Sequence, residues 1–326
     1  TQGTASQATV QITVTGVNDS PTAEDDLYTI DEDHVLVVDP VGVMDNDTDV
    51  DGDDFDVVGA DAVSAMGASV SVAADGSFTY DPTATTVLQE LDPGDEVVDT
   101  FTYTVADVYG DQSSATVSVR VTGRNDAPNA MDDSESTDED TVLNIVAPGV
   151  IQTDEDLDAD DVLSISDYDQ TSLLGAAIVM DVDGSFQYDP TSAPQLQALS
   201  EGQIEFDEFS YEVTDLRGDV DTATVQIRVT GVNDEPIAED DLYLIDEDHV
   251  LQVDPLGVLD NDNDVDGDPL RVLFADGTSQ AGAIVNVNDD GSFTYDPTAA
   301  AVLQEMPAGD RQFDSFEYIA VDVHGE

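Results

Sequence analysis

The stretch that decides the fold is "ATVSVRVTGRND" at residues 115–126, because the chain contains it three times in nearly the same form. The first copy, "ATVQITVTGVND", covers residues 8–19, and the third, "ATVQIRVTGVND", covers residues 223–234. In each copy apolar side chains alternate with polar ones, which is the period of a β-strand with one buried face. The copies lie 107 or 108 residues apart, so the repeating unit has the length of a whole domain.

Other short runs in the unit have the same period of two. Examples are "DGSFTYDP" at 75–82, "FTYTV" at 101–105 and "FSYEV" at 209–213. Turn signals such as "DG", "PG" and "ND" separate the runs, and only "PTATTVLQEL" at 82–91 and its counterparts favour a short helical turn. A domain-length repeat with several alternating strands predicts an all-β chain of tandem immunoglobulin-like sandwiches with about seven strands each.

The charge of the chain excludes two classes of partner. Its 326 residues include 75 aspartates and glutamates, six arginines and no lysine, for a net charge of −69. Nucleic acid and anionic membranes are repelled by such a surface, so neither is an expected partner. Composition alone leaves two interpretations open, a solubility adaptation to high salt or a set of carboxylates that bind Ca²⁺.

Disulfides, membrane insertion and catalysis are not expected. The chain has no cysteine and no apolar run near the length of a membrane span, and an export signal would lie outside this stretch. His34 and His249 occupy the same repeat position, where the middle copy has Thr141. An enzyme needs a constellation that is not repeated, and the sequence offers none, so we expect no enzyme activity.

A second acidic phrase, "DNDTDVDGDDF", covers residues 45–55 and recurs at 152–162 and 260–270. Alternate aspartates on an extended segment can converge on one hard cation. The phrase resembles the start of an EF-hand loop, but the twelfth position holds Val58 or Leu273, where that loop needs a bidentate glutamate.

Four motifs in fixed order carry a family resemblance: "VTGRNDAP" (121–128), "DEDHVL" (31–36), "DTDVDGD" (47–53) and "VAD" ending at Asp107. Together they resemble the bacterial cadherin-like repeats, also called VCBS repeats, of large secreted adhesins of the repeats-in-toxin type. The resemblance covers the whole chain and implies cadherin-like Greek-key sandwiches in an elongated array. The expected parts are a final strand and linker of a preceding repeat at 1–19, and repeats at 20–126, 127–234 and 235–326, the last without its final strand.

The resemblance also implies calcium, because in cadherins these motifs meet at the junctions between domains and bind Ca²⁺ there. The first junction would use Glu32, Asn125, Asp126, Asp156, Asp158 and Asp215. The second junction would use Glu139, Asn233, Asp234, Asp264, Asp266 and Asp322. A third set would face an upstream neighbour and consists of Asn18, Asp19, Asp49, Asp51 and Asp107. Three acids that recur in register are expected to add ligands: Asp26, Asp133 and Asp241.

Departures from the cadherin pattern change what we expect of the junctions. Gly123 and Gly231 stand where cadherin linkers begin with aspartate, which predicts about one or two ions per junction instead of three. The middle copy of the loop has Gln152, Thr153 and Ala159 where the first copy has Asp, Asn and Gly, so we expect the first junction to be the softer one. Turn formation by Asp and Asn is the alternative explanation for each acid.

The function implied is a calcium-rigidified extender or adhesion segment of a bacterial cell-surface or secreted protein, located outside the cell. The alternative is a calcium-dependent module that binds carbohydrate or protein, such as an accessory domain of a secreted polysaccharide-degrading enzyme. Expected partners are neighbouring repeats, with polysaccharide or another cadherin-like domain as alternatives. Exposed aromatic rings would favour sugar binding, and the candidates are Tyr28, Tyr109, Tyr168 and Tyr243.

The chain also predicts a pairing between molecules. Residues 4–16 match the final strand of a repeat at 111–123, and the third repeat stops at the counterpart of Asp111. An unpaired edge of a sandwich is a template for strand addition, so head-to-tail strand exchange between chains is a further expectation.

Overall fold

The computed structural model describes residues 2–3 and 5–325. Thr4, where the expected first strand begins, and Glu326, the expected end of the third repeat, lie outside the described residues. Contacts divide the chain into two compact units. The first unit runs to Pro128 and includes the loops 156–162 and 215–219; the second comprises residues 129–155, 163–214 and those from Val220 onward.

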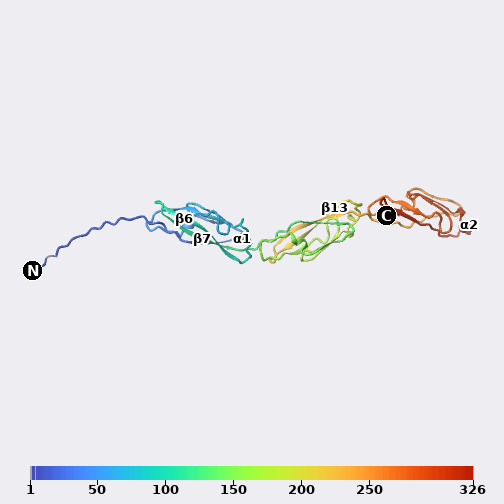
Figure 1. Ribbon diagram of the computed structural model, residues 1–326. Coiled ribbons are helices and arrows are strands. Elements are labelled where there is room, and N and C mark those ends of the chain that lie inside the picture. Colours follow the sequence, from blue (N-terminus) through green and yellow to red (C-terminus); the bar gives the residue numbers. More distant parts are fainter. Residues whose placement is uncertain (1, 4, 326) are drawn as a thin grey trace. The chain divides into compact units, whose positions relative to one another are not determined.

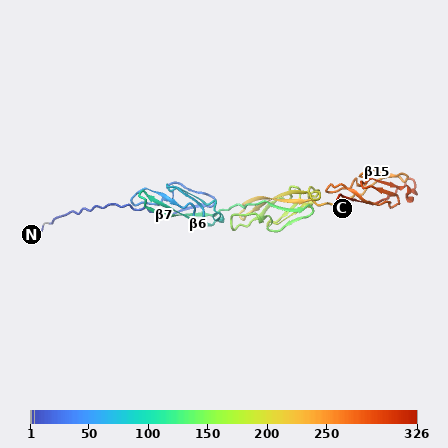
Figure 2. The same cartoon turned by 45° about the horizontal axis from the view of Figure 1, so that its top comes forward.

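The first repeat is a sandwich of seven strands, as the alternating runs predict. Its elements in chain order are β1 (Asp26–Asp31), β2 (Leu36–Val38), η1 (Gly42–Met44), β3 (Phe55–Ala60), β4 (Ser69–Val72), β5 (Phe78–Asp81), α1 (Thr86–Gln89), β6 (Glu96–Asp107) and β7 (Gln112–Thr122). One sheet has the order β1-β7-β6-β3 and the other β2-β5-β4. The long strands β6 and β7 lie side by side in Figure 1 and again in the turned view of Figure 2.

The register of β6 on β7 follows from the apolar alternation. Phe101 pairs with Val117 and Tyr103 with Ala115, and all four side chains are buried in one core. Phe78 from the opposite sheet meets Phe101 edge to face, with ring centroids 5.6 Å apart. Aromatic and β-branched side chains on the inner faces therefore hold the two sheets together.

The second repeat has the same seven-strand plan. Its elements are β8 (Asp133–Asp138), β9 (Leu143–Ile145), η2 (Gly149–Gln152), β10 (Ser164–Tyr168), β11 (Ala177–Met180), β12 (Phe186–Asp189), η3 (Pro190–Ser192), β13 (Ile204–Thr214) and β14 (Val220–Thr230). The sheets have the orders β10-β13-β14-β8 and β11-β12-β9. The expected all-β immunoglobulin-like class is therefore confirmed in both copies.

The third repeat has fewer paired strands among the residues that the structure describes. Its elements are β15 (Leu251–Val253), η4 (Gly257–Leu259), β16 (Arg271–Ala275), β17 (Ile284–Val287), β18 (Phe293–Asp296), η5 (Pro297–Ala299), α2 (Ala301–Gln304) and β19 (Tyr318–Val321). Residues 241–246, the counterpart of β1, are in no strand. In the first repeat that strand pairs in parallel with β7, and a strand without a partner ladder is not stable by itself.

The N-terminal copy of the alternating motif is likewise not part of a sheet. Val10, Ile12 and Val14 are exposed, and residues 5–20 contain no strand. The alternation was a correct sign of a sheet strand in the other copies, at 112–122 and 220–230. Alternation of apolar side chains alone does not form a strand, because the hydrogen bonds of a sheet come from a neighbouring strand.

A carboxylate that the sequence did not single out recurs in each repeat, fully buried in the first two and half-buried in the third. Asp207 is fully buried and accepts hydrogen bonds from the hydroxyls of Ser172 and Tyr188 and from the backbone N–H groups of Leu174 and Glu208. Its counterparts Asp99 and Asp314 have the corresponding partners in their own repeats. A buried charge surrounded by donors on all sides can stay in a core.

Candidate metal centre

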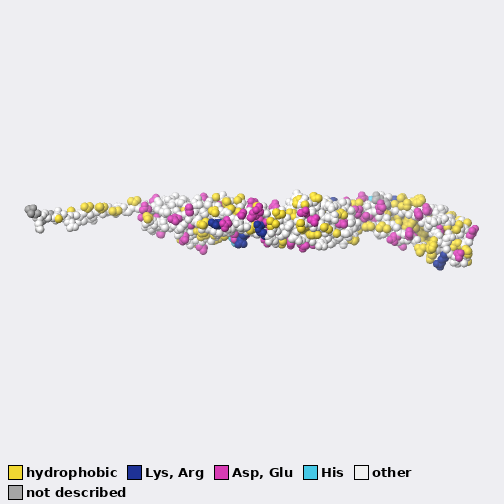
Figure 3. Space-filling view, turned by 90° about the horizontal axis from the view of Figure 1, so that it is seen from below, with side chains coloured by type: hydrophobic (Ala, Val, Ile, Leu, Met, Phe, Trp, Pro, Cys, Tyr) yellow, Lys and Arg dark blue, Asp and Glu magenta, His cyan; other side chains and the backbone are white. Residues whose placement is uncertain are grey.

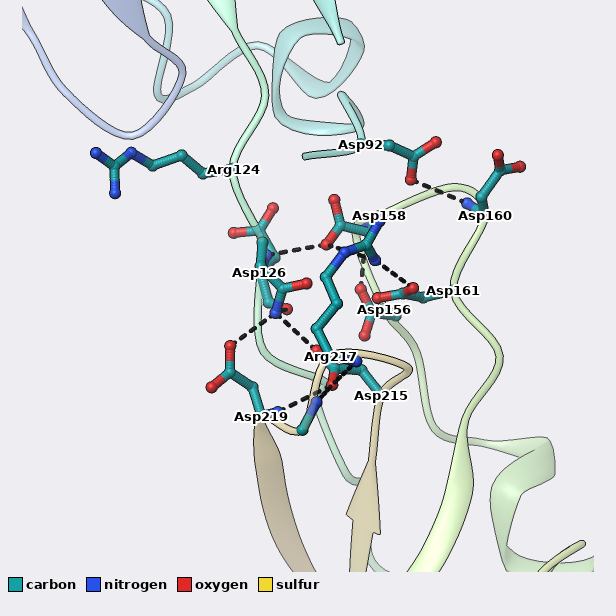
Figure 4. A network of polar contacts seen from close by, with 12 residues as sticks. Asp92, Arg124, Asp126, Asp156, Asp158, Asp160, Asp161, Asp215, Arg217 and Asp219 are labelled. Carbon is teal, nitrogen blue, oxygen red and sulfur yellow. Dashed lines mark hydrogen bonds and ion pairs between the residues drawn. The ribbon is translucent and has the colours of Figure 1, made fainter. Parts of the chain in front are cut away.

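In the first unit, the linker after β7 is fastened by its own side chains. The amide Nδ2 of Asn125 donates to Oδ2 of Asp215 and to Oδ2 of Asp219, each at 2.7 Å. The backbone N–H of Asp126 donates to Oδ2 of Asp158 at 3.0 Å. Figure 4 shows these contacts where the linker passes two loops, one carrying Asp156–Asp161 and the other Asp215–Asp219.

The same two hydrogen bonds recur in the other copies of the linker. They join Asn233 to Asp322 (2.7 Å) and Asp234 to Asp266 (3.0 Å), and Asn18 to Asp107 (2.8 Å) and Asp19 to Asp51 (2.8 Å). In each copy the asparagine side chain donates to the aspartate at or just after the end of the strand that precedes the hairpin loop. The backbone N–H of the next residue donates to an aspartate of the acidic loop. This recurrence explains why asparagine and aspartate stand together in all three linkers.

The loop carboxylates converge in each copy. Oxygens lie within 4.8 Å of one another in four sets: Asp49, Asp51 and Asp53; Asp156, Asp158 and Asp161; Asp264, Asp266 and Asp268; and Glu139, Asp234 and Asp266. We call the acids around Asn125 the first linker cluster (Asn125, Asp126, Asp156, Asp158, Asp161, Asp215) and those around Asn233 the second linker cluster (Glu139, Asn233, Asp234, Asp264, Asp266, Asp268, Asp322).

Sequence reasoning missed the third acid of each loop: Asp53, Asp161 and Asp268. In two copies it directly follows a glycine, and Gly52 has a φ of 80° while Gly267 has 76°. The middle copy has Ala159 in place of this glycine, and its turn closes two residues later in register, with the N–H of Asp161 donating to the carbonyl of Asp158 at 3.2 Å. Asp161 therefore joins the cluster instead of Asp160, which is the residue in register.

The glutamate of the "DED" element is buried beside the linker in the first two repeats. Glu32 and Glu139 have no exposed surface, and their Oε1 atoms accept the backbone N–H of Arg124 and of Val232, each at 2.6 Å. Burial raises the pKa of both carboxyls to about 7. Glu139 reaches an acidic set of the following repeat, whereas Glu32 is in none of the sets found among the described residues.

Glycine begins the linker because a side chain does not fit there. A Cβ on Gly123 would lie 2.2 Å from the carbonyl oxygen of Asp92, and one on Gly231 would lie 2.3 Å from that of Ser200. The aspartate that opens cadherin linkers is therefore sterically excluded at both positions. Gly16, the third copy, has no atom within 4 Å of such a Cβ.

The donor set fits a hard cation such as calcium. Buried oxygens that accept no hydrogen bond belong to Asn18, Asp26, Glu32, Asp49, Asn125, Asp126, Asp156, Asp158, Asp161, Asn233, Asp234, Asp241, Asp264 and Asp266. A buried carboxylate oxygen without a donor is costly, and a cation is the partner that removes the cost. Burial raises the pKa of Asp126, Asp156 and Asp234, and brings that of Asp158 to about 6.

The structure places Asp26, Asp133 and Asp241 away from the linkers, so it does not bring these expected extra ligands into either cluster. Asp26 pairs with Val117 in the middle of β7, between the two ends where linkers and loops meet. Its carboxyl faces Asp47 beside the Tyr103 hydroxyl, and burial together with that neighbouring charge raises its pKa to about 7. Asp133 and Asp241 have the equivalent neighbours in their repeats.

The recurring tyrosines are each held by contacts within their own repeat, although Tyr28 is only half-buried and Tyr243 is 37% exposed. The Tyr28 hydroxyl donates to the carbonyl of Gly42 at 3.1 Å, and that of Tyr243 to Gly257 at 2.9 Å. Each ring also packs edge to face on a core phenylalanine. Tyr168 is half-buried against its core, and Tyr109 is exposed. The rings that recur in register are therefore engaged by their own repeats.

Acidic side chains are spread along the face shown in Figure 3, and basic ones are few. The described part of the chain contains no helix with the length and apolarity needed to cross a membrane.

Fold and linkers together define a class of protein, tandem immunoglobulin-like sandwiches whose linkers are fastened by acidic loops. A family model described as bacterial cadherin-like domain matches residues 18–123, 125–231 and 233–326. The chain therefore belongs to the bacterial cadherin-like domain family, and the resemblance seen in the motifs is confirmed. A comparison with curated proteins found no match.

Solved cadherin structures are similar at low identity. Human CDH23 EC21-23 is 13% identical over 91% of this chain and 97% of that chain, with a TM-score of 0.44. The human desmocollin-1 ectodomain is 11% identical over 95% of this chain, with a TM-score of 0.38, and the match spans 57% of its own length. Drosophila N-cadherin EC1-4 is 12% identical over 92% of this chain and 74% of that chain, with a TM-score of 0.35.

Proposed function

We propose that this chain is a calcium-rigidified extender or adhesion segment of a bacterial cell-surface or secreted protein. The observation that supports it most is the set of buried, unpartnered oxygens on the linkers and on the loops they contact. Calcium binds six to eight such oxygens and would supply the positive charge that these carboxylates share. Joined through one ion, a linker and its loop cannot move independently, which would stiffen a tandem array.

The residues proposed to hold the ions come from three segments. At the second linker cluster these are the buried Glu139 before the linker, Asn233 and Asp234 within it, and the loop acids led by Asp266. At the first linker cluster they are Asn125 and Asp126 with the loop acids Asp156, Asp158 and Asp161. Glu32 would become a ligand only if its side chain moved closer to these acids. The third set, around Asn18, is proposed to serve an upstream neighbour.

Extension is favoured over sugar binding, because the aromatic rings that recur are engaged by hydrogen bonds and ring contacts within their own repeats. We propose no catalytic role, since the acids repeat in register instead of forming a single constellation. An extracellular location, the adhesin context and contacts with other cadherin-like domains belong to the same proposal.

Small-angle scattering and thermal unfolding with and without calcium test the proposal. Millimolar Ca²⁺ should increase the maximum dimension, narrow the distance distribution and raise Tm, because extracellular-type sites have Kd values on the order of 10⁻⁴ to 10⁻³ M. Mg²⁺ at the same concentration controls for general screening of the charge. A scattering profile and Tm that do not respond to calcium would refute the proposal.

A further inference from the structure

Arg217 is a basic residue inside the first linker cluster. It lies in the loop between β13 and β14, two residues after Asp215. Its guanidinium forms an ion pair with Oδ1 of Asp161, and its Nη1 lies 4.0 Å from Oδ2 of Asp158. The side chains of both acids are fully buried, and that of Arg217 is 34% exposed. Figure 4 shows the guanidinium between the two loops.

The guanidinium leaves one oxygen of each loop acid without a hydrogen bond. Oδ2 of Asp161, Oδ1 of Asp158 and Oδ2 of Asp156 remain buried and accept no hydrogen bond. Arg217 therefore lies beside the proposed ion and leaves its ligand atoms available. Since a guanidinium stays protonated in proteins, this positive charge is permanent.

Arg217 also acts near the linker. Oδ2 of Asp158, which lies 4.0 Å from Nη1 of Arg217, is also the acceptor for the backbone N–H of Asp126. A cation that holds Asp158 in place thus helps to hold the linker on its loop, even with no divalent ion bound.

The equivalent positions of the other repeats carry no permanent charge. The first repeat has the exposed Tyr109. The third repeat has His324, whose Nε2 lies 3.4 Å from Oδ2 of Asp268 and whose Nδ1 lies 2.8 Å from Glu201. Asp268 is the third acid of its loop, as Asp161 is, so the position beside this acid recurs, but only the middle copy fills it with arginine.

We propose that Arg217 is a built-in cation of the first linker cluster, which keeps the linker at 123–126 fastened at calcium concentrations at which the linker at 231–234 is released. This inference rests on the proposed calcium function. The loop sequence predicts that the first linker is released before the second as calcium is withdrawn, and this inference reverses that order. The sequence-based expectation considered the ligands and the turn residues but not Arg217.

Hydrogen exchange of two matched amides tests it. The N–H of Asp126 bonds Asp158, and the N–H of Asp234 makes the same bond to Asp266, each at 3.0 Å. In chelator the Asp126 amide should exchange more slowly than the Asp234 amide, and Arg217→Gln should speed exchange at Asp126 on the order of tenfold. Arg271→Gln, an exposed arginine on β16, controls for the change in net charge.

A second variant adds an arginine instead of removing one, so that its expected effect cannot be explained by a loss of folding. His324→Arg should slow exchange of the Asp234 amide in chelator and leave Asp126 unchanged. If Arg217→Gln exchanges like the parent at Asp126 while Asp234 responds to calcium, the inference is wrong and the proposed function stands. If neither amide responds to calcium, the proposed function fails, and the inference fails with it.

Discussion

A carboxylate oxygen of Glu139 lies within 4.8 Å of one of Asp266, although the first residue precedes the linker and the second follows it. Glu139 is fully buried, and Asp266 holds the N–H of Asp234 in that linker. Two acids placed this close repel unless a proton or a cation lies between them. Binding of a proton or of a metal ion between these two acids is therefore expected to stabilise the conformation of the linker.

Glu139→Gln should have opposite effects with and without calcium. In chelator the variant should be at least as stable as the parent, because it removes a buried charge close to two aspartates. In millimolar calcium it should be less stable, because one ligand is lost. Thermal unfolding in both conditions measures the difference. An equal shift of Tm in both would contradict the assignment of Glu139 as a ligand.

The pH dependence of stability should invert when calcium is added. Folding raises the pKa of Glu32 and Glu139 from 4.5 to about 7, so in chelator the folded state binds more protons than the unfolded state between these values. Stability in chelator should therefore fall as the pH rises from about 5 to about 8. With calcium, protons compete for the same oxygens, and stability should rise over that range. Chemical denaturation at both pH values, each with and without calcium, checks the signs.

Gly231→Ala should loosen the second linker, whereas Gly16→Ala should have no measurable effect. The added Cβ would approach two carbonyl oxygens at 2.3 and 2.5 Å, but at Gly16 it meets nothing within 4 Å. We expect a loss of about 1–3 kcal/mol at Gly231, typical of overpacking. Denaturant unfolding compares the pair. Equal stability of both variants would show that the linker does not need this close approach.

Asp207→Asn should destabilise the second repeat whether or not calcium is present. An amide replaces an acceptor that four donors surround, so buried donors lose their partner at a cost of about 2–4 kcal/mol. Glu205→Gln, an exposed change on the same strand, is the matched control. Both are measured by denaturant unfolding in calcium and in chelator, and an effect of Asp207→Asn confined to one condition would contradict a structural role.

Head-to-tail strand exchange between chains remains a prediction, and two segments that are in no strand, 5–20 and 241–246, make it specific. By the register of β1 on β7, residues 241–246 would pair in parallel with residues 10–15 of another chain. Leu242, Leu244, Val10 and Val14 are exposed and would be covered. Light scattering across concentration should show assembly that is lost when residues 1–15 are deleted. A monomer at every concentration, or assembly that survives the deletion, would contradict it.

Much of this molecule follows from local patterns. The alternation in "ATVSVRVTG" correctly predicts that Val117, Val119 and Val121 face a core, because a strand turns every second side chain to the same side. Recurrence at domain length correctly predicts tandem sandwiches, and the asparagine of the linker forms hydrogen bonds to Asp215 and, in the next copy, to Asp322.

The tertiary structure decided which acids converge. Asp161 replaces Asp160 because Ala159 does not follow the turn that Gly52 makes, and Asp26 is remote because β1 pairs with the middle of β7. No spacing rule brings Arg217 to Asp161, since one comes from a strand hairpin and the other from a loop far earlier in the chain. Local period depends on neighbouring residues alone, whereas convergence of charges depends on the path of the whole backbone.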